Sequence, residues 1–197
     1  MGLDMMQVCP VKLRIERNRQ GRMETVTLTS VFLFLKMPKL DMVLPLGDPR
    51  LYQVCEPVKP EEVKALEPAI TDLLDIILEF RAKYNAGRAI AAPQIGVMKR
   101  LICMNIDKPV VIFNPELTNL SEEMIELWDD CMCFPNLLVR LKRHRHLTLT
   151  FRDQNWEEQR WNLSDDLSEL IQHEYDHLDG ILATQRAIDD RSFRWRS

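Results

Sequence analysis

Two histidines and a glutamate near the end of the chain carry the clearest chemical pattern. The sequence QHEYDH contains an H-E-x-x-H motif, with its histidines at His173 and His177. Residues four apart lie on one face of a helix, so both imidazoles can bind one metal ion, and Glu174 can act on a water molecule there. The apolar neighbours Leu170 and Leu178 place this face against the core. We therefore favour a metal site over two histidines on a solvated surface.

Two histidines leave such a site incomplete, because a catalytic centre of this kind has three protein ligands and one open position. A metallopeptidase would place its third histidine at the position of Ala183, which argues against that class. Asp189 and Asp190 are the acids best separated from the predicted helix, but nothing marks either as a ligand. His144 and His146 alternate among lysine and arginine residues, and we interpret them as part of an exposed, cationic strand face.

Cysteine is the remaining soft donor. The segment WDDCMCFP lies between two predicted strands, and a thiolate from it would complete a Cys-His-His site. Cys131 and Cys133 are the two candidates, because residues two apart in an extended chain cannot easily both reach one ion. Without the helix motif, both would be interpreted as small buried hydrophobic residues.

A third patch, GRAIAAPQIG, spans residues 87–96 and is small and apolar. Such a sequence lets the backbone approach a ligand closely. Gln94 supplies a side-chain amide that can donate to a carbonyl oxygen. Taken alone, this patch would indicate only a tight turn.

The spacing of apolar residues predicts the elements that position these three patches. A helix is expected from Pro68 to about Asn85, with Gly87 as its C-terminal cap. Ser164 is expected to cap the helix that carries the histidines. Between them lie short antiparallel strands at Leu101–Asn105, Val110–Phe113, Met124–Leu127, Leu137–Leu141 and Leu147–Phe151. The predicted class is α+β.

Composition limits the partners and the number of domains. The 197 residues carry a formal net charge of −4, which argues against binding to nucleic acid or anionic lipid. The longest apolar runs are far shorter than the roughly 20 residues of a membrane-spanning helix. Residues 1–36 are expected to form a loosely packed extension or a targeting segment, and residues 37–197 one catalytic domain. Five cysteines, an odd number, favour a reducing compartment.

Together and in this order, the three patches resemble the motifs of peptide deformylases, G-x-G-Φ-A-A-P-Q-Φ-G, E-G-C-L-S and Q-H-E-x-D-H-L-x-G. The corresponding segments here are Gly87–Gly96, Asp129–Cys133 and Gln172–Gly180, within a resemblance that covers about Val43 to Ile188. It implies small antiparallel sheets around a central, metal-binding C-terminal helix, with an N-terminal helix against a sheet. The implied enzyme is a hydrolase that removes the N-formyl group from the formylmethionine of new polypeptides and releases formate.

The resemblance also implies roles for individual residues. One divalent metal ion, most often Fe²⁺ with Zn²⁺, Ni²⁺ or Co²⁺ as substitutes, would activate a water molecule. Glu174 would take up its proton and deliver it to the departing nitrogen. The Gln94 side chain and the backbone N–H of Met132 would stabilise the oxyanion. The metal ligands would be Cys131, His173 and His177.

Substrate binding follows from the same resemblance. Leu127 and Leu170 are expected to form the wall of the methionine pocket, and the peptide would add as a strand near Gly87 and Ala89. The implied partners are nascent chains near the ribosome, bound by a monomer during N-terminal methionine processing. The expected location is the cytoplasm, or an organelle if residues 1–36 are a targeting segment.

Several positions depart from the family pattern. Ala89 replaces a glycine, which predicts crowding of the substrate and weaker peptide binding, and Arg88 replaces an apolar residue. Asp129 and Asp130 replace Glu-Gly, and Cys133 replaces serine. These changes leave open a second hypothesis, a deformylase-like protein that binds metal and peptide N-termini with reduced or lost turnover.

The replacement of glutamate by Asp129 leads to a further expectation. Asp129 is one methylene shorter than the family glutamate, so a partner must come closer to its carboxylate. We expect Arg143 to be that partner.

Overall fold

The computed structural model describes residues 39–196. The extension predicted over residues 1–36 lies outside this range, so its loosely packed or targeting character stays a prediction. In the described range, no helix is both long and apolar enough to cross a membrane. Short 3₁₀ turns occur at Lys39–Met42, Pro49–Tyr52, Pro60–Glu62, Ala92–Ile95 and Ala183–Arg186.

The first long helix, α1, spans Val63–Tyr84 and begins five residues before the predicted start at Pro68. A proline near the beginning of a helix removes only one backbone hydrogen bond, so Pro68 does not prevent this earlier start. The helix ends at Asn85, which has a left-handed φ of 52° and donates its N–H to the Arg81 carbonyl (2.9 Å). The prediction that Gly87 caps the helix was therefore wrong.

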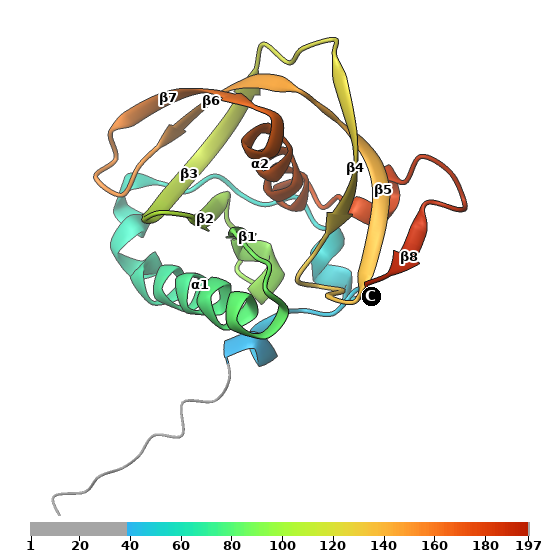
Figure 1. Cartoon of the computed structure of the whole chain (residues 1–197). Helices are drawn as coiled ribbons and strands as arrows, with labels where there is room; N and C mark the ends of the chain where they lie inside the picture. Colours follow the sequence, from blue (N-terminus) through green and yellow to red (C-terminus); the bar gives the residue numbers. More distant parts are fainter. Residues whose placement is uncertain (1–38, 197) are drawn as a thin grey trace, which may run out of the picture. The chain divides into compact units, whose positions relative to one another are not determined.

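Eight strands form two antiparallel sheets in the described part of the chain (Figure 1). The five-stranded sheet has the order β1-β2-β3-β6-β7, with strands Ala89–Ala91, Leu101–Asn105, Pro109–Thr118, His146–Arg152 and Glu158–Ser164. The three-stranded sheet has the order β4-β5-β8, with strands Met124–Asp130, Leu137–His144 and Phe193–Trp195. All five predicted strands are confirmed, whereas β1, β7 and β8 were missed.

The sequence suggested that His144 and His146 share one strand, but they do not. His144 ends β5 and His146 begins β6, so the two residues belong to different sheets. The break at Arg145 lets the chain cross from one sheet to the other. Its backbone is held there, because the Arg145 N–H donates to the Glu123 carbonyl (2.9 Å) and the Arg145 carbonyl accepts from the Asp165 N–H (2.8 Å).

The second long helix, α2, spans Asp165–Leu178 and lies between the two sheets (Figure 1). Ser164 stands at its N-cap position as predicted, but the serine side chain makes no capping hydrogen bond. Its hydroxyl instead lies 3.1 Å from Nδ1 of His146. The expectation of antiparallel sheets around a central C-terminal helix is confirmed.

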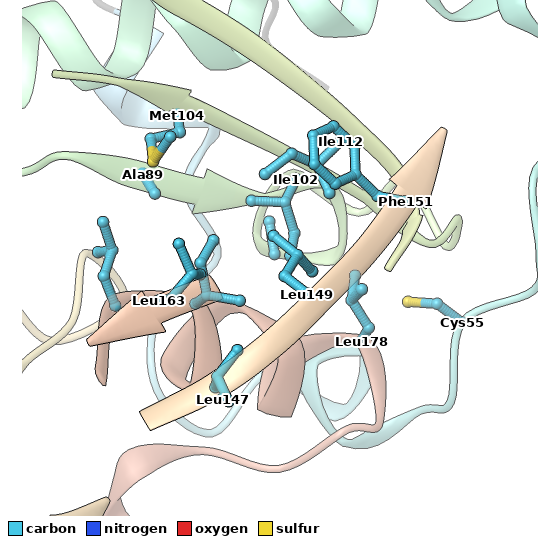
Figure 2. Packing of buried hydrophobic residues seen from close by; sticks show 13 residues of the cluster. Cys55, Ala89, Ile102, Met104, Ile112, Leu147, Leu149, Phe151, Leu163 and Leu178 are labelled. Carbon is cyan, nitrogen blue, oxygen red and sulfur yellow. The ribbon is translucent and has the colours of Figure 1, made fainter. Parts of the chain in front are cut away.

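Apolar packing fixes α2 and α1 against the larger sheet. On one side, Ile171 and Leu178 of α2 join buried residues of β2, β3 and β6, among them Ile102 and Leu149 (Figure 2). A second cluster packs the buried stripe of α1 against β1, β2 and β3, and its α1 members are Leu73, Ile76 and Ile77. The sheet is thus covered on both faces, and α2 is held rigidly enough to position side chains for chemistry.

Candidate metal centre

The cysteine and both histidines that the sequence singled out converge in the structure. The ligand atoms of Cys131, His173 and His177 all lie within 4.8 Å of one another, and all three residues are buried. Cys131 directly follows β4, whereas the histidines lie four residues apart on α2. Cys131 Sγ lies 3.3 Å from Nε2 of His177. A single ion can therefore contact all three side chains.

The competing ligands do not join this cluster. Asp189 is bound to Ser192 and Arg140 at the surface, and Asp190 is also exposed. Cys133 is buried but lies outside the three-residue group. The choice between Cys131 and Cys133, which spacing alone left open, therefore favours Cys131.

Hydrogen bonds orient the first histidine. Nδ1 of His173 lies 2.9 Å from the Asp129 carboxylate, which leaves Nε2 for a metal ion. Arg143 donates to the same carboxylate oxygen at 3.2 Å, so the expected Asp129–Arg143 pair is confirmed. The donor set of one thiolate and two neutral imidazoles suits Fe²⁺ or Zn²⁺ and leaves room for a further ligand. The residues present thus fit a catalytic ion.

The buried charges shift the pKa values of the three ligands. Burial lowers the pKa of His173, but the Asp129 carboxylate outweighs this effect and raises it to about 10. Burial and the neighbouring His173 charge hold the pKa of His177 well below its usual value. Burial raises the pKa of the Cys131 thiol. A metal ion must therefore displace protons from Cys131 and His173 but meets a neutral His177.

Glu174 follows His173 on α2 and is a buried carboxyl group that lines the same cavity as His173 and Cys131. Only 3% of its surface is exposed, and its Oε2 atom has no hydrogen-bond partner in the described part of the chain. Burial raises the pKa of Glu174 to about 7. A carboxyl group with this pKa can both accept and donate a proton near neutral pH.

Gln94 approaches the centre from the five-stranded sheet. The short turn after β1 carries Gln94, whose Oε1 accepts the Ala91 N–H at 2.8 Å. This bond turns the amide NH₂ group towards sulfur, with Nε2 3.6 Å from Cys131 Sγ and 3.5 Å from Cys133 Sγ. The side chain that was expected to stabilise an oxyanion thus lies beside Cys131.

A cavity of about 80 Å³ opens beside these groups. It lies where β1 and β4 come together, each the first strand of its sheet. The residues that line it include Met132, His173 and Glu174. They also include all four predicted substrate residues, Gly87, Ala89, Leu127 and Leu170. A larger cavity of about 320 Å³ touches another face of α2 and contains none of the predicted site residues, so the smaller one is the candidate substrate pocket.

Sequence reasoning missed two sets of charged partners. Arg88, directly before β1, reaches Asp166 (3.2 Å) and Glu169 on α2, and both Arg88 and Glu169 line the small cavity. Asp176, inside the histidine motif, binds both Arg143 and Arg186. An acidic residue inside a buried helical motif needs a charged partner, so Asp176 itself was the available sign of the second set.

Comparison with known proteins agrees with this arrangement. The family model for polypeptide deformylase matches residues 40–192. Peptide deformylase from the Wolbachia endosymbiont of Brugia malayi is 36% identical over 161 residues, covering 74% of this chain and 86% of the relative.

Solved structures give the same result. Peptide deformylase from Thermotoga maritima superposes with a TM-score of 0.67 at 26% identity, covering 75% of this chain and 97% of that one. The enzyme from Legionella pneumophila has a TM-score of 0.66 at 29% identity, covering 73% and 83%. The chain therefore belongs to the peptide deformylase family, metal-dependent hydrolases that remove the N-formyl group from new polypeptides.

Proposed function

We propose that Cys131, His173 and His177 hold the divalent ion and that Glu174 carries the proton during deformylation. The observation that carries this proposal is the convergence of three buried ligands, from the end of β4 and from α2, in the same part of the molecule as a buried carboxylate with one unpartnered oxygen. We further propose Fe²⁺ as the native ion, with Zn²⁺, Ni²⁺ or Co²⁺ as substitutes, because one thiolate and two imidazoles suit all four.

Proton movement can be assigned to Glu174. The bound ion supplies Lewis acidity for a water molecule and for the formyl carbonyl group. Glu174 accepts the proton that this water loses as its oxygen attacks the formyl carbon, and it delivers a proton to the amide nitrogen as the C–N bond breaks. The products are formate and a free amino terminus. A pKa of about 7 suits both transfers, since neither form of the carboxyl group is strongly favoured.

Two donors are proposed to stabilise the negative charge on the formyl oxygen. The Gln94 amide is held by Ala91 with its NH₂ group directed at the centre. Met132 follows Cys131 in a turn that the Phe134 N–H closes onto the Cys131 carbonyl (3.1 Å). Loss of one such donor typically lowers kcat by about 10²- to 10³-fold. Gln94→Ala should show a decrease of that size.

The methionine side chain is proposed to enter the cavity between Leu127 and Leu170. The peptide backbone would run along the edge of β1 near Gly87 and Ala89, where strand addition reads main chain rather than sequence. Gly87 has a φ of 101°, and a Cβ atom there would lie 3.0 Å from Phe80 and 3.1 Å from Met132. A side chain here would be strained by the positive φ and would require the Phe80 and Met132 side chains to move.

We propose that the protein acts as a monomer on nascent chains close to the ribosome. The net charge of −4 argues against direct binding to nucleic acid. The unpaired cysteines Cys55, Cys103, Cys131 and Cys133 suit a reducing compartment, the cytoplasm or an organelle if residues 1–36 direct the chain there.

The test is formate release from formyl-Met-Ala-Ser by anaerobically purified, metal-quantified protein, with an internal peptide as the control for proteolysis. The parent protein should release formate and leave the control peptide intact. Glu174→Gln should retain metal and lose turnover, whereas His173→Ala should lose both. Peptide binding by metal-loaded parent protein without formate release would contradict the proposal and support a binding protein instead.

A further inference from the structure

The C-terminal strand β8 follows residue 192, where the match to the family ends. It pairs with β5 through Leu137 opposite Trp195 and Val139 opposite Phe193. The Arg196 N–H extends this pairing by donating to the Asn136 carbonyl at 2.8 Å. Figure 1 shows β8 on the side of β5 away from β4. The strand is therefore separated from the substrate cavity by one strand.

Two arginine side chains of this segment reach across β5 to β4. The guanidinium carbon of Arg194 lies 4.1 Å from the centre of the Trp128 ring. Arg196 forms an ion pair with the Asp130 carboxylate and donates through Nε to the Pro135 carbonyl at 3.1 Å. Residues two apart in an extended chain share a face. The two arginines are two residues apart, as are Trp128 and Asp130, so each arginine can reach one of these β4 side chains.

The two β4 side chains that receive these contacts belong to the substrate cavity. Trp128 and Asp130 both line it, and Asp130 directly precedes the metal ligand Cys131. The Asp130 side chain is 37% exposed and that of Arg196 is 27% exposed, so the pair lies where solvent meets the cavity. In the substrate site proposed above, the residues that follow the formyl-methionine pass this rim.

We propose that Arg194 and Arg196 are positioning residues that hold the rim of the substrate cavity, and that Arg196 makes this rim tolerant of charge. The proposal rests on the substrate site described above. With Arg196 in place, the negative charge of Asp130 is balanced, and peptides with an acidic or a basic second residue meet a rim of similar potential. Without Arg196, the unpaired Asp130 carboxylate attracts basic residues and repels acidic ones.

The experiment compares the metal-loaded, full-length parent with Arg196→Gln on two substrates, formyl-Met-Lys-Ala and formyl-Met-Glu-Ala. The ratio of kcat/KM for the lysine peptide to that for the glutamate peptide should rise by about two- to fivefold, the range for a partly exposed charge pair. The change should lie in KM rather than kcat, since Arg196 acts on the rim and not on the reacting atoms. Arg196→Lys should restore the parent ratio.

Two further variants separate charge from folding. Arg196→Gln combined with Asp130→Asn should return the ratio to that of the parent, because the unbalanced charge is gone. Arg191→Gln is the matched control, since Arg191 is exposed and its backbone N–H bonds to Asp189. It should leave the ratio unchanged.

Arg194 is tested by its own contact. Arg194→Ala should raise KM for both peptides by about two- to fivefold, because the Trp128 ring loses the nearer of its two cation partners and keeps only Arg140, 6.0 Å from the ring centre.

Each failure has a distinct meaning. An unchanged ratio in Arg196→Gln, or a shifted ratio that persists with Asp130→Asn, would overturn the role of Arg196. An unchanged KM in Arg194→Ala would overturn the role of Arg194. Absence of formate release by the parent would instead contradict the proposed function.

Discussion

Gly180 links the end of the metal-binding helix to the N-terminal part of the domain. Gly180 follows α2 with a φ of 70°, and a Cβ atom there would lie 2.6 Å from the Tyr52 carbonyl carbon and 2.9 Å from the Gln53 nitrogen. These are backbone atoms, so no side-chain rotation can relieve the overlap. The same segment is tied to α2 by the Cys55 N–H, which donates to the Leu178 carbonyl at 2.8 Å.

Gly180→Ala is therefore expected to destabilise the protein through two effects. A non-glycine residue in the left-handed region costs about 1–2 kcal/mol. Forcing a methyl group into packed atoms costs about 1–3 kcal/mol more. The free energy of unfolding should fall by about 2–5 kcal/mol in total, a large fraction of the stability of a typical domain.

The chain offers a matched control in Gly47. Its φ of 99° is also positive, but nothing lies within 4 Å of a Cβ atom built there. Gly47→Ala should therefore lose only the conformational part, about 1–2 kcal/mol. Guanidinium unfolding of both variants and the parent, at one metal loading, measures the difference. Equal losses in the two variants would refute the argument from backbone overlap.

Three further predictions concern the centre itself. Asp129→Asn removes the negative charge that holds His173 and should weaken metal affinity by about 10- to 100-fold, measured by competition with a chelator; unchanged affinity would show that the charge of Asp129 does not matter for metal binding. Metal affinity should rise with pH through the neutral range, because the pKa of His173 is raised to about 10 and that of Cys131 is also raised, so both hold protons that the ion must displace. Calorimetry in buffers of different ionisation enthalpy should detect this proton release, and a pH-independent affinity would contradict it. Ala89→Gly should raise kcat/KM for formyl-methionyl peptides, because the buried Ala89 methyl group borders the substrate cavity; an equal value in the parent would remove the crowding hypothesis.

Local patterns predicted most of the secondary structure, and their failures have physical causes. The helical spacing of α2 and the β-branched or alternating residues of β2–β6 are properties of neighbouring residues. Strand β1 has three consecutive buried residues and no alternation, so periodicity gives no signal there. Strand β8 is a three-residue strand whose side chains are all exposed. Strands of this kind depend on the partners that the fold provides, which neighbouring residues do not specify.

The candidate site likewise combines residues that local spacing identifies with a residue that only the tertiary fold brings close. His173, Glu174 and His177 could be found because one helix turn brings them together. Cys131 lies on another element, and its approach to α2 depends on how β4 packs beside that helix. The resemblance to a family supplied that pairing, whereas residue spacing alone left Cys131 and Cys133 equal.

The sequence was less informative about residues that contact the proposed metal ligands only through other side chains. Arg143 was expected beside Asp129 because a shortened carboxylate needs a close partner, and the two form an ion pair. The second partner of Arg143, Asp176, was marked only as an acid inside a buried helical motif, which did not identify Arg143, because their contact joins α2 to β5. Long-range ion pairs of this kind follow from the tertiary fold.

The terminal positions of β1 and β4 in their sheets have a consequence for solubility. An unpaired strand edge offers N–H and C=O groups that other proteins can bind, and exposed edges therefore promote aggregation. Here both strands border one small cavity of about 80 Å³ beside the metal ligands. A cavity of that size favours a single extended chain end over a second sheet as the partner of these backbone groups.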